Sequence, residues 1–175
     1  MTDTADIRDD LDRHRLELLR RKLSERGLRS TPQPQAETPV SGLSEGQRRI
    51  WFVQMADPTG AILNICLSYR ITGELDMARL RKALNAVARR HDVLRTTYRA
   101  DADGEPQLTV HDDLTPRWSA HDLSDLSHHA RQLRLEVLAQ REFSAPFDLG
   151  VDAPLRLTVA RTGRDEHVML LVAHH

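Results

Sequence analysis

Hydrophobic residues recur at helical spacing in four stretches of the chain and alternate with polar residues in several others. Side chains three and four positions apart share one face of a helix, so the first pattern predicts helices at about residues 7–26, 44–55, 76–91 and 125–142. Neighbouring side chains of a strand point to opposite faces, so alternation predicts strands at about 65–71, 93–99, 107–111, 117–120 and 155–159. Residues 167–174 are mostly apolar at both parities, which predicts a central strand buried on both faces.

Polar residues mark where three of these helices begin. Ser44-Glu45-Gly46-Gln47 matches a capping box, Asp76 can cap the next helix, and Asp125 or Ser127 can start the last one. The alternation in 65–71 assigns the inward face of that strand to Ile65, Leu67, Tyr69 and Ile71. The spacing in 125–142 assigns the inward face of that helix to Ala130, Leu133, Val137 and Leu138.

Interspersed strands and helices predict an α/β (α+β) fold with a mixed sheet covered by helices, built from residues 40–175. Residues 1–39 form a separate segment, with a helix at 7–26 followed by a proline-rich linker at 29–39. Seven basic residues lie from Arg13 to Arg29, against only Glu17 and Glu25. The helix either docks an upstream protein through this charge or packs its leucines on its own domain.

Composition narrows the class of protein. Lys plus Arg is 25 and Asp plus Glu is 26, so there is no basic excess for a nucleic-acid partner. Apolar runs fall far short of the ~20 residues of a membrane helix, and the acidic, polar N-terminus does not resemble a signal peptide. A single cysteine, Cys66, excludes an internal disulfide and fits a cytoplasmic protein.

Nine histidines raise the question of a metal site or a catalytic base. His128 and His129 are adjacent on the predicted helix and point about 100° apart, so they do not chelate one ion, and we expect no bound metal. His174 and His175 follow the predicted central strand, at the kind of strand end where sites open. Since alternate side chains face opposite ways, only one of the two can face a given cavity, where a neutral imidazole can accept a proton or orient an amine.

Five segments, in order, resemble the N-terminal part of the condensation domains of nonribosomal peptide synthetases. Residues 43–52 (LSEGQRRIWF) are similar to the opening motif of the family, and residues 90–98 (RHDVLRTTY) to its second motif. Asn64-Ile65 with Leu75-Asp76 lie between these two motifs, as in the family. Residues 146–149 (PFDL) with Pro154-Leu155-Arg156, and then residues 172–175 (VAHH), follow them in the family's order. The last of these matches the start of the active-site motif H-H-x-x-x-D-G. The resemblance covers about residues 42–175.

The resemblance implies a lobe similar to chloramphenicol acetyltransferase, one of two that enclose a tunnel. Upstream and downstream carrier proteins bring donor and acceptor thioesters to the tunnel on phosphopantetheine arms, so no cofactor is bound directly. The acceptor amine attacks the donor thioester to form an amide, in secondary-metabolite biosynthesis. His175 would be the catalytic histidine, as a general base or by positioning the amine. His174 and Arg95 would support the site, and Arg48 of the opening motif would help shape the tunnel.

The sequence given ends at His175, before the aspartate and glycine of that motif and before the second lobe. We therefore expect the isolated chain to be inactive and Arg95 to lack the aspartate it pairs with in the family. The alternative to an amide-forming domain is a module that recruits carrier proteins or tailoring enzymes without chemistry. The starter and epimerising subtypes stay open, because they keep the double histidine.

Overall fold

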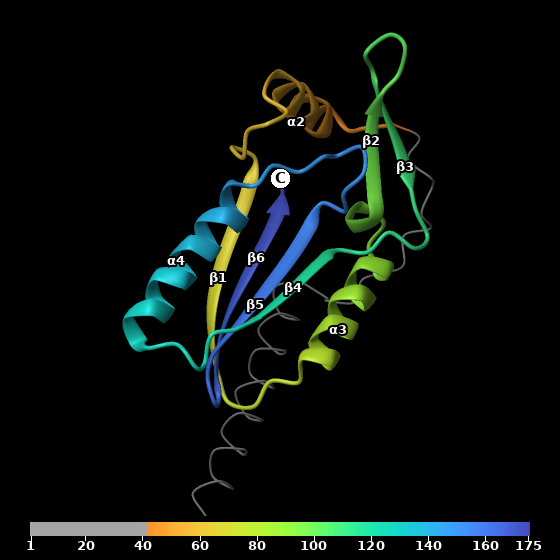
Figure 1. Cartoon of the computed structure of the whole chain (residues 1–175). Helices are drawn as coiled ribbons and strands as arrows, with labels where there is room; N and C mark the ends of the chain where they lie inside the picture. The colour runs from red at the N-terminus through yellow and green to blue at the C-terminus, as the bar shows by residue number, and fades with distance from the viewer. Residues whose placement is uncertain (1–41) are drawn as a thin grey trace, which may run out of the picture. The chain divides into compact units, whose positions relative to one another are not determined.

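A four-stranded mixed sheet organises residues 42–175, the part of the chain that the computed structural model describes (Figure 1). Its strands lie in the order β1 (Asn64–Thr72), β6 (Glu166–His174), β5 (Leu155–Gly163) and β4 (Arg117–Asp122). β6 is antiparallel to both of its neighbours, and β4 is parallel to β5. The apolar run at 167–174 therefore does form a central strand, as its composition predicted. The expected helix and linker at residues 1–39 lie outside the described residues.

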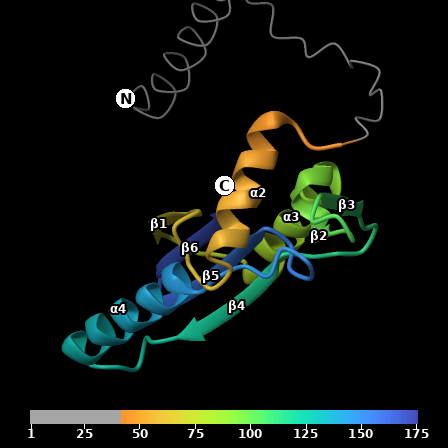
Figure 2. The same cartoon turned by 90° about the horizontal axis from the view of Figure 1, so that it is seen from above.

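Two helices pack on opposite faces of this sheet (Figure 2). α3 (Met77–Arg90) buries Leu84 against Leu157 and Val159 of β5. α4 (His128–Ser144) packs Leu138 against Ala160 and Leu170 on the other face. Successive side chains of β5 and β6 point to opposite faces, so the sheet has one apolar layer under each helix.

The helix starts follow the predicted caps. At the start of α2 (Glu45–Ala56), the Gln47 backbone N–H donates to Ser44 Oγ at 3.2 Å, and the Ser44 backbone N–H donates to Gln47 Oε1 at 2.9 Å. Asp76 accepts from the backbone N–H of Arg79 before α3, and Ser127 accepts from that of Ala130 before α4. Each cap satisfies an N–H that the first helical turn leaves without a partner.

A second, two-stranded sheet pairs β2 (Thr96–Ala100) with β3 (Pro106–Val110). The strand expected from residue 93 begins later, because residues 92–95 form a 3-10 turn, η1 (Asp92–Arg95). The Thr96 hydroxyl donates to the Asp92 carbonyl at 2.7 Å and so holds this turn closed. The tip of the hairpin needs Gly104, whose φ is +82°, a conformation that costs other residues energy.

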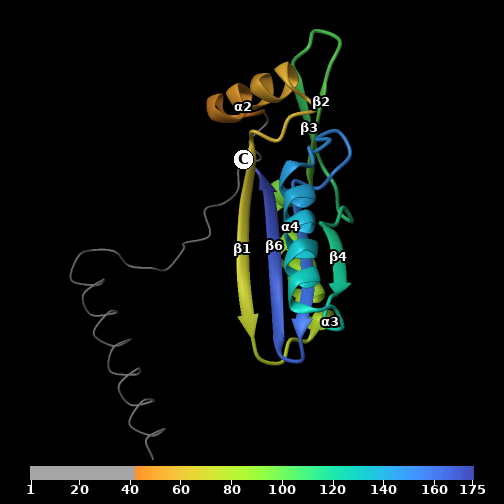
Figure 3. The same cartoon turned by 60° about the vertical axis from the view of Figure 1, so that its left-hand side comes forward.

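The sequence pattern was wrong about which side chains of two elements are buried. Ile65, Leu67 and Tyr69 of β1 are 40–46% exposed, because β1 is an edge strand and α3 packs over β5, further along the sheet (Figure 3). On α4, Leu133 and Val137 are also exposed. The buried stripe of α4 is turned by about one residue, and it consists of Leu135, Leu138, Ala139, Glu142 and Phe143.

Candidate active site

A pocket of about 530 Å³ opens at the carboxyl end of β6, under α2 and beside η1. His175 is exposed and lines this pocket, which we call the His175 pocket. The position agrees with the expectation that a site opens at the end of the central strand. Most of the lining is apolar, and its residues are Leu43, Gly46, Gln47, Arg49, Ile50, Trp51, Val93, Leu94, Tyr98, Leu149, Pro154, Ala173, His174 and His175.

Both histidines line this pocket, contrary to the expectation that only one of them faces a given cavity, since the pocket spans the strand end, with His174 the last residue of β6 and His175 just beyond it. The backbone N–H of His175 donates to the Leu63 carbonyl at 2.9 Å, which continues the pairing of β6 with the chain before β1. The ring of His174 borders the pocket, but its polar contacts lie elsewhere: Nε2 is 3.0 Å from Gln54 Oε1, and the ring meets Phe147 edge-on at 6.0 Å between centroids. Burial lowers the pKa of His174 below its usual value, and the hydrogen bond to the His175 backbone oxygen offsets this only in part.

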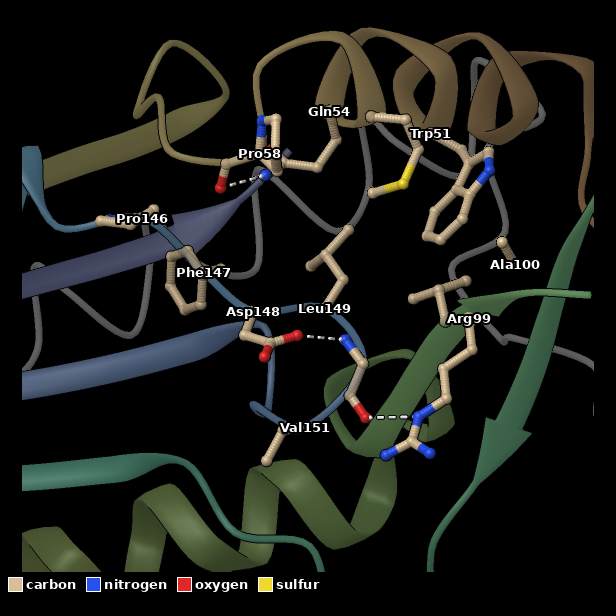
Figure 4. A pocket seen from close by; sticks show the side chains of 13 residues that line it. Trp51, Gln54, Pro58, Arg99, Ala100, Pro146, Phe147, Asp148, Leu149 and Val151 are labelled. Carbon is tan, nitrogen blue, oxygen red and sulfur yellow. Dashed lines mark hydrogen bonds between the residues drawn. The ribbon is translucent and has the colours of Figure 1, made fainter. Parts of the chain in front are cut away.

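A second pocket, of about 520 Å³, lies beneath the carboxyl half of α2 (Figure 4). Trp51, Tyr98 and Leu149 line both pockets and so form the partition between them. Trp51 is 4% exposed and packs on Phe147 and Leu149, as expected for a structural residue of the first helix of the lobe. Burial also raises the pKa of the Tyr98 hydroxyl, which therefore stays protonated at neutral pH.

Arg95 has other ionic partners among the described residues, in the absence of the motif aspartate that it is expected to lack. Its guanidinium pairs with Asp92, donates to the His111 carbonyl at 2.8 Å, and lies 3.6 Å from Asp112. The 3-10 turn of η1 places Asp92 on the same side as Arg95, which explains this pairing. The Nε of Arg95 is nevertheless buried without a hydrogen-bond partner among residues 42–175.

The two arginines of the opening motif point to different places. Arg48 forms an ion pair with Glu105 of the β2–β3 hairpin at 2.9 Å and lines neither of the two pockets described above. Its neighbour Arg49 lines the His175 pocket. The opening motif therefore contributes Arg49 to this pocket, whereas the sequence suggested its neighbour Arg48.

Sequence reasoning missed a buried ionic cluster that lies against Phe147. The carboxylate of Glu142 is bound by Arg141 at 2.8 Å and by Arg117 at 3.1 Å, and Arg156 Nε lies 4.0 Å away. The Arg156 guanidinium also lies 4.1 Å from the centroid of the Phe147 ring. Burial raises the pKa of Glu142, but the hydrogen bonds and charges of Arg141 and Arg117 outweigh it and hold the pKa below its usual value. The charged Arg156 between Leu155 and Leu157, in a strand that the sequence predicts, was the available signal.

The described residues contain neither a cluster of metal ligands nor a membrane-spanning helix. Among residues 42–175, no three His, Cys, Asp or Glu side chains are placed to hold a metal ion. In the same residues, no helix has both the length and the apolar character that crossing a membrane requires.

Comparison with known proteins assigns the family. The model of the condensation domain family matches residues 38–175. A linear gramicidin synthase of Brevibacillus parabrevis is 37% identical over 133 residues, 76% of this chain and 2% of that protein. Phosphinothricin tripeptide synthetase PhsC of Streptomyces viridochromogenes is 36% identical over 142 residues, 81% of this chain and 13% of that protein. The chain thus spans a small part of the length of these relatives.

Solved structures agree on the fold. The first condensation domain of the calcium-dependent antibiotic synthetase superposes with a TM-score of 0.66 at 24% identity, over 77% of this chain and 32% of that one. The starter condensation domain of rhizomide synthetase gives 0.67 at 20% identity, over 77% and 32%. These matches confirm the predicted fold class, a mixed α/β lobe similar to chloramphenicol acetyltransferase. The chain belongs to the condensation domain family of nonribosomal peptide synthetases.

Proposed function

We propose that residues 40–175 are the N-terminal lobe of a condensation domain that forms an amide bond. The donor is an acyl or peptidyl thioester and the acceptor an aminoacyl thioester, each carried on the phosphopantetheine arm of a carrier protein. The observation that carries the proposal is the position of His175. It directly follows the central strand of the sheet and lines an apolar pocket of about 530 Å³.

The chemistry needs an amine, a thioester and an acceptor for one proton. The amine nitrogen attacks the thioester carbonyl carbon, so that a C–N bond forms, the C–S bond breaks and the thiolate leaves. The amine gives up a proton, which the His175 imidazole accepts or, where the imidazole only orients the amine for attack, the departing thiolate accepts. An apolar lining supports this step because desolvation disfavours the charged ammonium, which has no lone pair for attack.

Three further residues complete the proposed site. His174 holds the end of β6 through its contacts with Gln54 and Phe147. Arg95 is the anchor for the aspartate of the active-site motif, and its buried Nε, which has no partner within residues 42–175, supports this role. Arg48 remains a candidate for shaping the tunnel, and its ion pair with Glu105 ties α2 to the hairpin that contributes Tyr98 to both pockets.

The partners of this lobe follow from the same proposal. Upstream and downstream carrier proteins deliver the substrates, and the C-terminal lobe of the domain supplies the second tunnel wall. We expect the isolated chain to be inactive, because it covers about a third of the solved condensation domains that it matches. Residues 1–39 are a candidate docking segment for an upstream synthetase subunit.

The decisive experiment uses the full-length synthetase with loaded donor and acceptor carrier proteins. His175→Ala is expected to abolish the amide product, measured by mass spectrometry of the acceptor carrier. His129→Ala, an exposed residue at the start of α4, is the matched control and is expected to keep wild-type turnover. Undiminished product in His175→Ala would remove the catalytic assignment and favour a recruitment module.

A further inference from the structure

The side chain of His174 lies between two oxygen atoms and one aromatic ring. Nε2 faces Gln54 Oε1 at 3.0 Å, and Nδ1 faces the backbone oxygen of His175 at 3.0 Å. A neutral imidazole carries one proton and can donate to only one of these oxygens at a time. The protonated nitrogen is therefore set by whichever oxygen is held more firmly.

Gln54 is the more firmly held of the two partners. It is 4% exposed on α2, and its amide nitrogen points to the Pro58 carbonyl at 3.5 Å (Figure 4). This leaves Oε1 directed at His174. The competing oxygen belongs to His175, which is exposed. The fixed acceptor favours a proton on Nε2 of His174, donated to Gln54.

Phe147 fixes the ring from a second direction. It is 4% exposed, and its plane makes an angle of 87° with the imidazole plane. Arg156 lies over the Phe147 ring and is itself anchored by donating to the carbonyls of Glu142 at 2.7 Å and Pro146 at 3.2 Å. The imidazole thus contacts two buried side chains from separate parts of the chain. Gln54 of α2 is held by the Pro58 carbonyl, and Phe147 is held by the Arg156 guanidinium.

We propose that Gln54 is a positioning residue for the histidine pair. It accepts the Nε2 proton of His174 and fixes that ring against Phe147, so that His175, one peptide bond away, is directed into the His175 pocket. The consequence for turnover rests on the proposed function, whereas the hydrogen bond itself does not. A contact between residues 120 positions apart links α2 to the end of β6 in this way.

The first test is nitrogen-15 NMR of the histidine rings in the 175-residue chain with an amidated C-terminus, so that the competing oxygen of His175 belongs to a neutral amide, and with the His174 signals identified by their loss in His174→Gln. At mildly alkaline pH we expect the tautomer protonated on Nε2. Gln54→Leu should shift the ring signals of His174, and Gln54→Glu, which keeps an oxygen acceptor, should restore the Nε2–H tautomer. Gln140→Leu, at an exposed position of α4, should leave the His174 signals unchanged. A ring protonated on Nδ1, or His174 signals unaltered in Gln54→Leu, overturns the proposal.

The second test is turnover in the full-length synthetase. Gln54→Leu should lower kcat about 10-fold to 100-fold with little change in KM, because small displacements of a reacting group cost rates of this order. Gln54→Glu should recover most of the loss, and a fold defect common to both variants would appear in their thermal midpoints. Unchanged kcat in Gln54→Leu overturns the positioning role. If His175→Ala also keeps full turnover, the proposed function itself has failed, which separates the two results.

Discussion

Replacing Arg156 with methionine tests whether the buried ionic cluster stabilises the lobe. The Arg156 side chain is 3% exposed and donates to the carbonyls of Glu142, Ala145 and Pro146, on the chain that leads from α4 to Phe147. Methionine fills a similar volume but donates no hydrogen bond. The substitution therefore leaves three carbonyls without this donor and Glu142 with one cation fewer.

The structure sets the expected magnitude. Removing one member of a buried ion pair costs about 3–5 kcal/mol, and each buried group left unsatisfied costs about 1–3 kcal/mol. Glu142 keeps Arg117 and Arg141, and these partners are more than half exposed and reach it from the solvent side. We therefore expect a loss near the lower end, about 3 kcal/mol in the free energy of unfolding.

Urea unfolding followed by tryptophan fluorescence and circular dichroism measures this loss. Arg117→Met is the matched control, since Arg117 binds the same carboxylate with a side chain that is 57% exposed, so that its removal leaves no buried cation site empty and should cost less than Arg156→Met. The m-value should stay the same in both variants, so that the midpoints report stability. A loss below about 1 kcal/mol in Arg156→Met, or one equal to that of Arg117→Met, would refute the reasoning.

Three further predictions concern acid stability, a helix cap and the core. Because the pKa of Glu142 is held below its usual value, its charge stabilises the fold above about pH 4.3, the ordinary pKa of an unfolded glutamate, and this contribution disappears as the pH falls through the lowered pKa. Glu142→Gln should therefore flatten the acid side of the curve of unfolding free energy against pH, and an unchanged curve would contradict this. Ser44→Ala should cost about 1 kcal/mol in thermal or urea unfolding through loss of the capping box, whereas Ser44→Thr should cost less. Leu138→Ala should lower the free energy of unfolding by about 2–5 kcal/mol. Leu133→Ala should lower it by under about 1 kcal/mol, although the sequence pattern assigned Leu133 to the core as well. Similar losses for both variants would mean that the structure has the wrong face of α4 buried.

Local chemistry carried most of the correct predictions. Helix caps at Ser44, Asp76 and Ser127 depend on side chains within three residues of their partners, so the sequence contains both halves of each interaction. The central position of β6 followed from apolar residues at both strand parities, which only a strand covered on both faces can bury. The sequence also places His174 and His175 at the end of that strand, because they directly follow its apolar run.

Burial and long-range polar contacts could not be predicted in this way. Alternation in β1 shows that Leu67 and Tyr69 share a face, but it does not show whether a helix covers that face. On α4, leucines occur on adjacent faces, and only the packing against Leu170 decides that Leu138 is inside. The contacts of Arg156 with Glu142 and of Gln54 with His174 depend on the tertiary fold. No rule of sequence spacing links these residues, so the sequence pattern does not predict the contacts.

The end of β6 gives two identical side chains different surroundings. Both histidines line the His175 pocket, but the half-buried ring of His174 is also tied to Gln54 of α2, whereas His175 is exposed just beyond the strand. With His174 held by Gln54 and Phe147, the backbone on one side of His175 is fixed, and the Leu63 carbonyl fixes its N–H. Under the proposed function, the half-buried His174 supplies the rigidity that the exposed His175 side chain needs and cannot provide for itself.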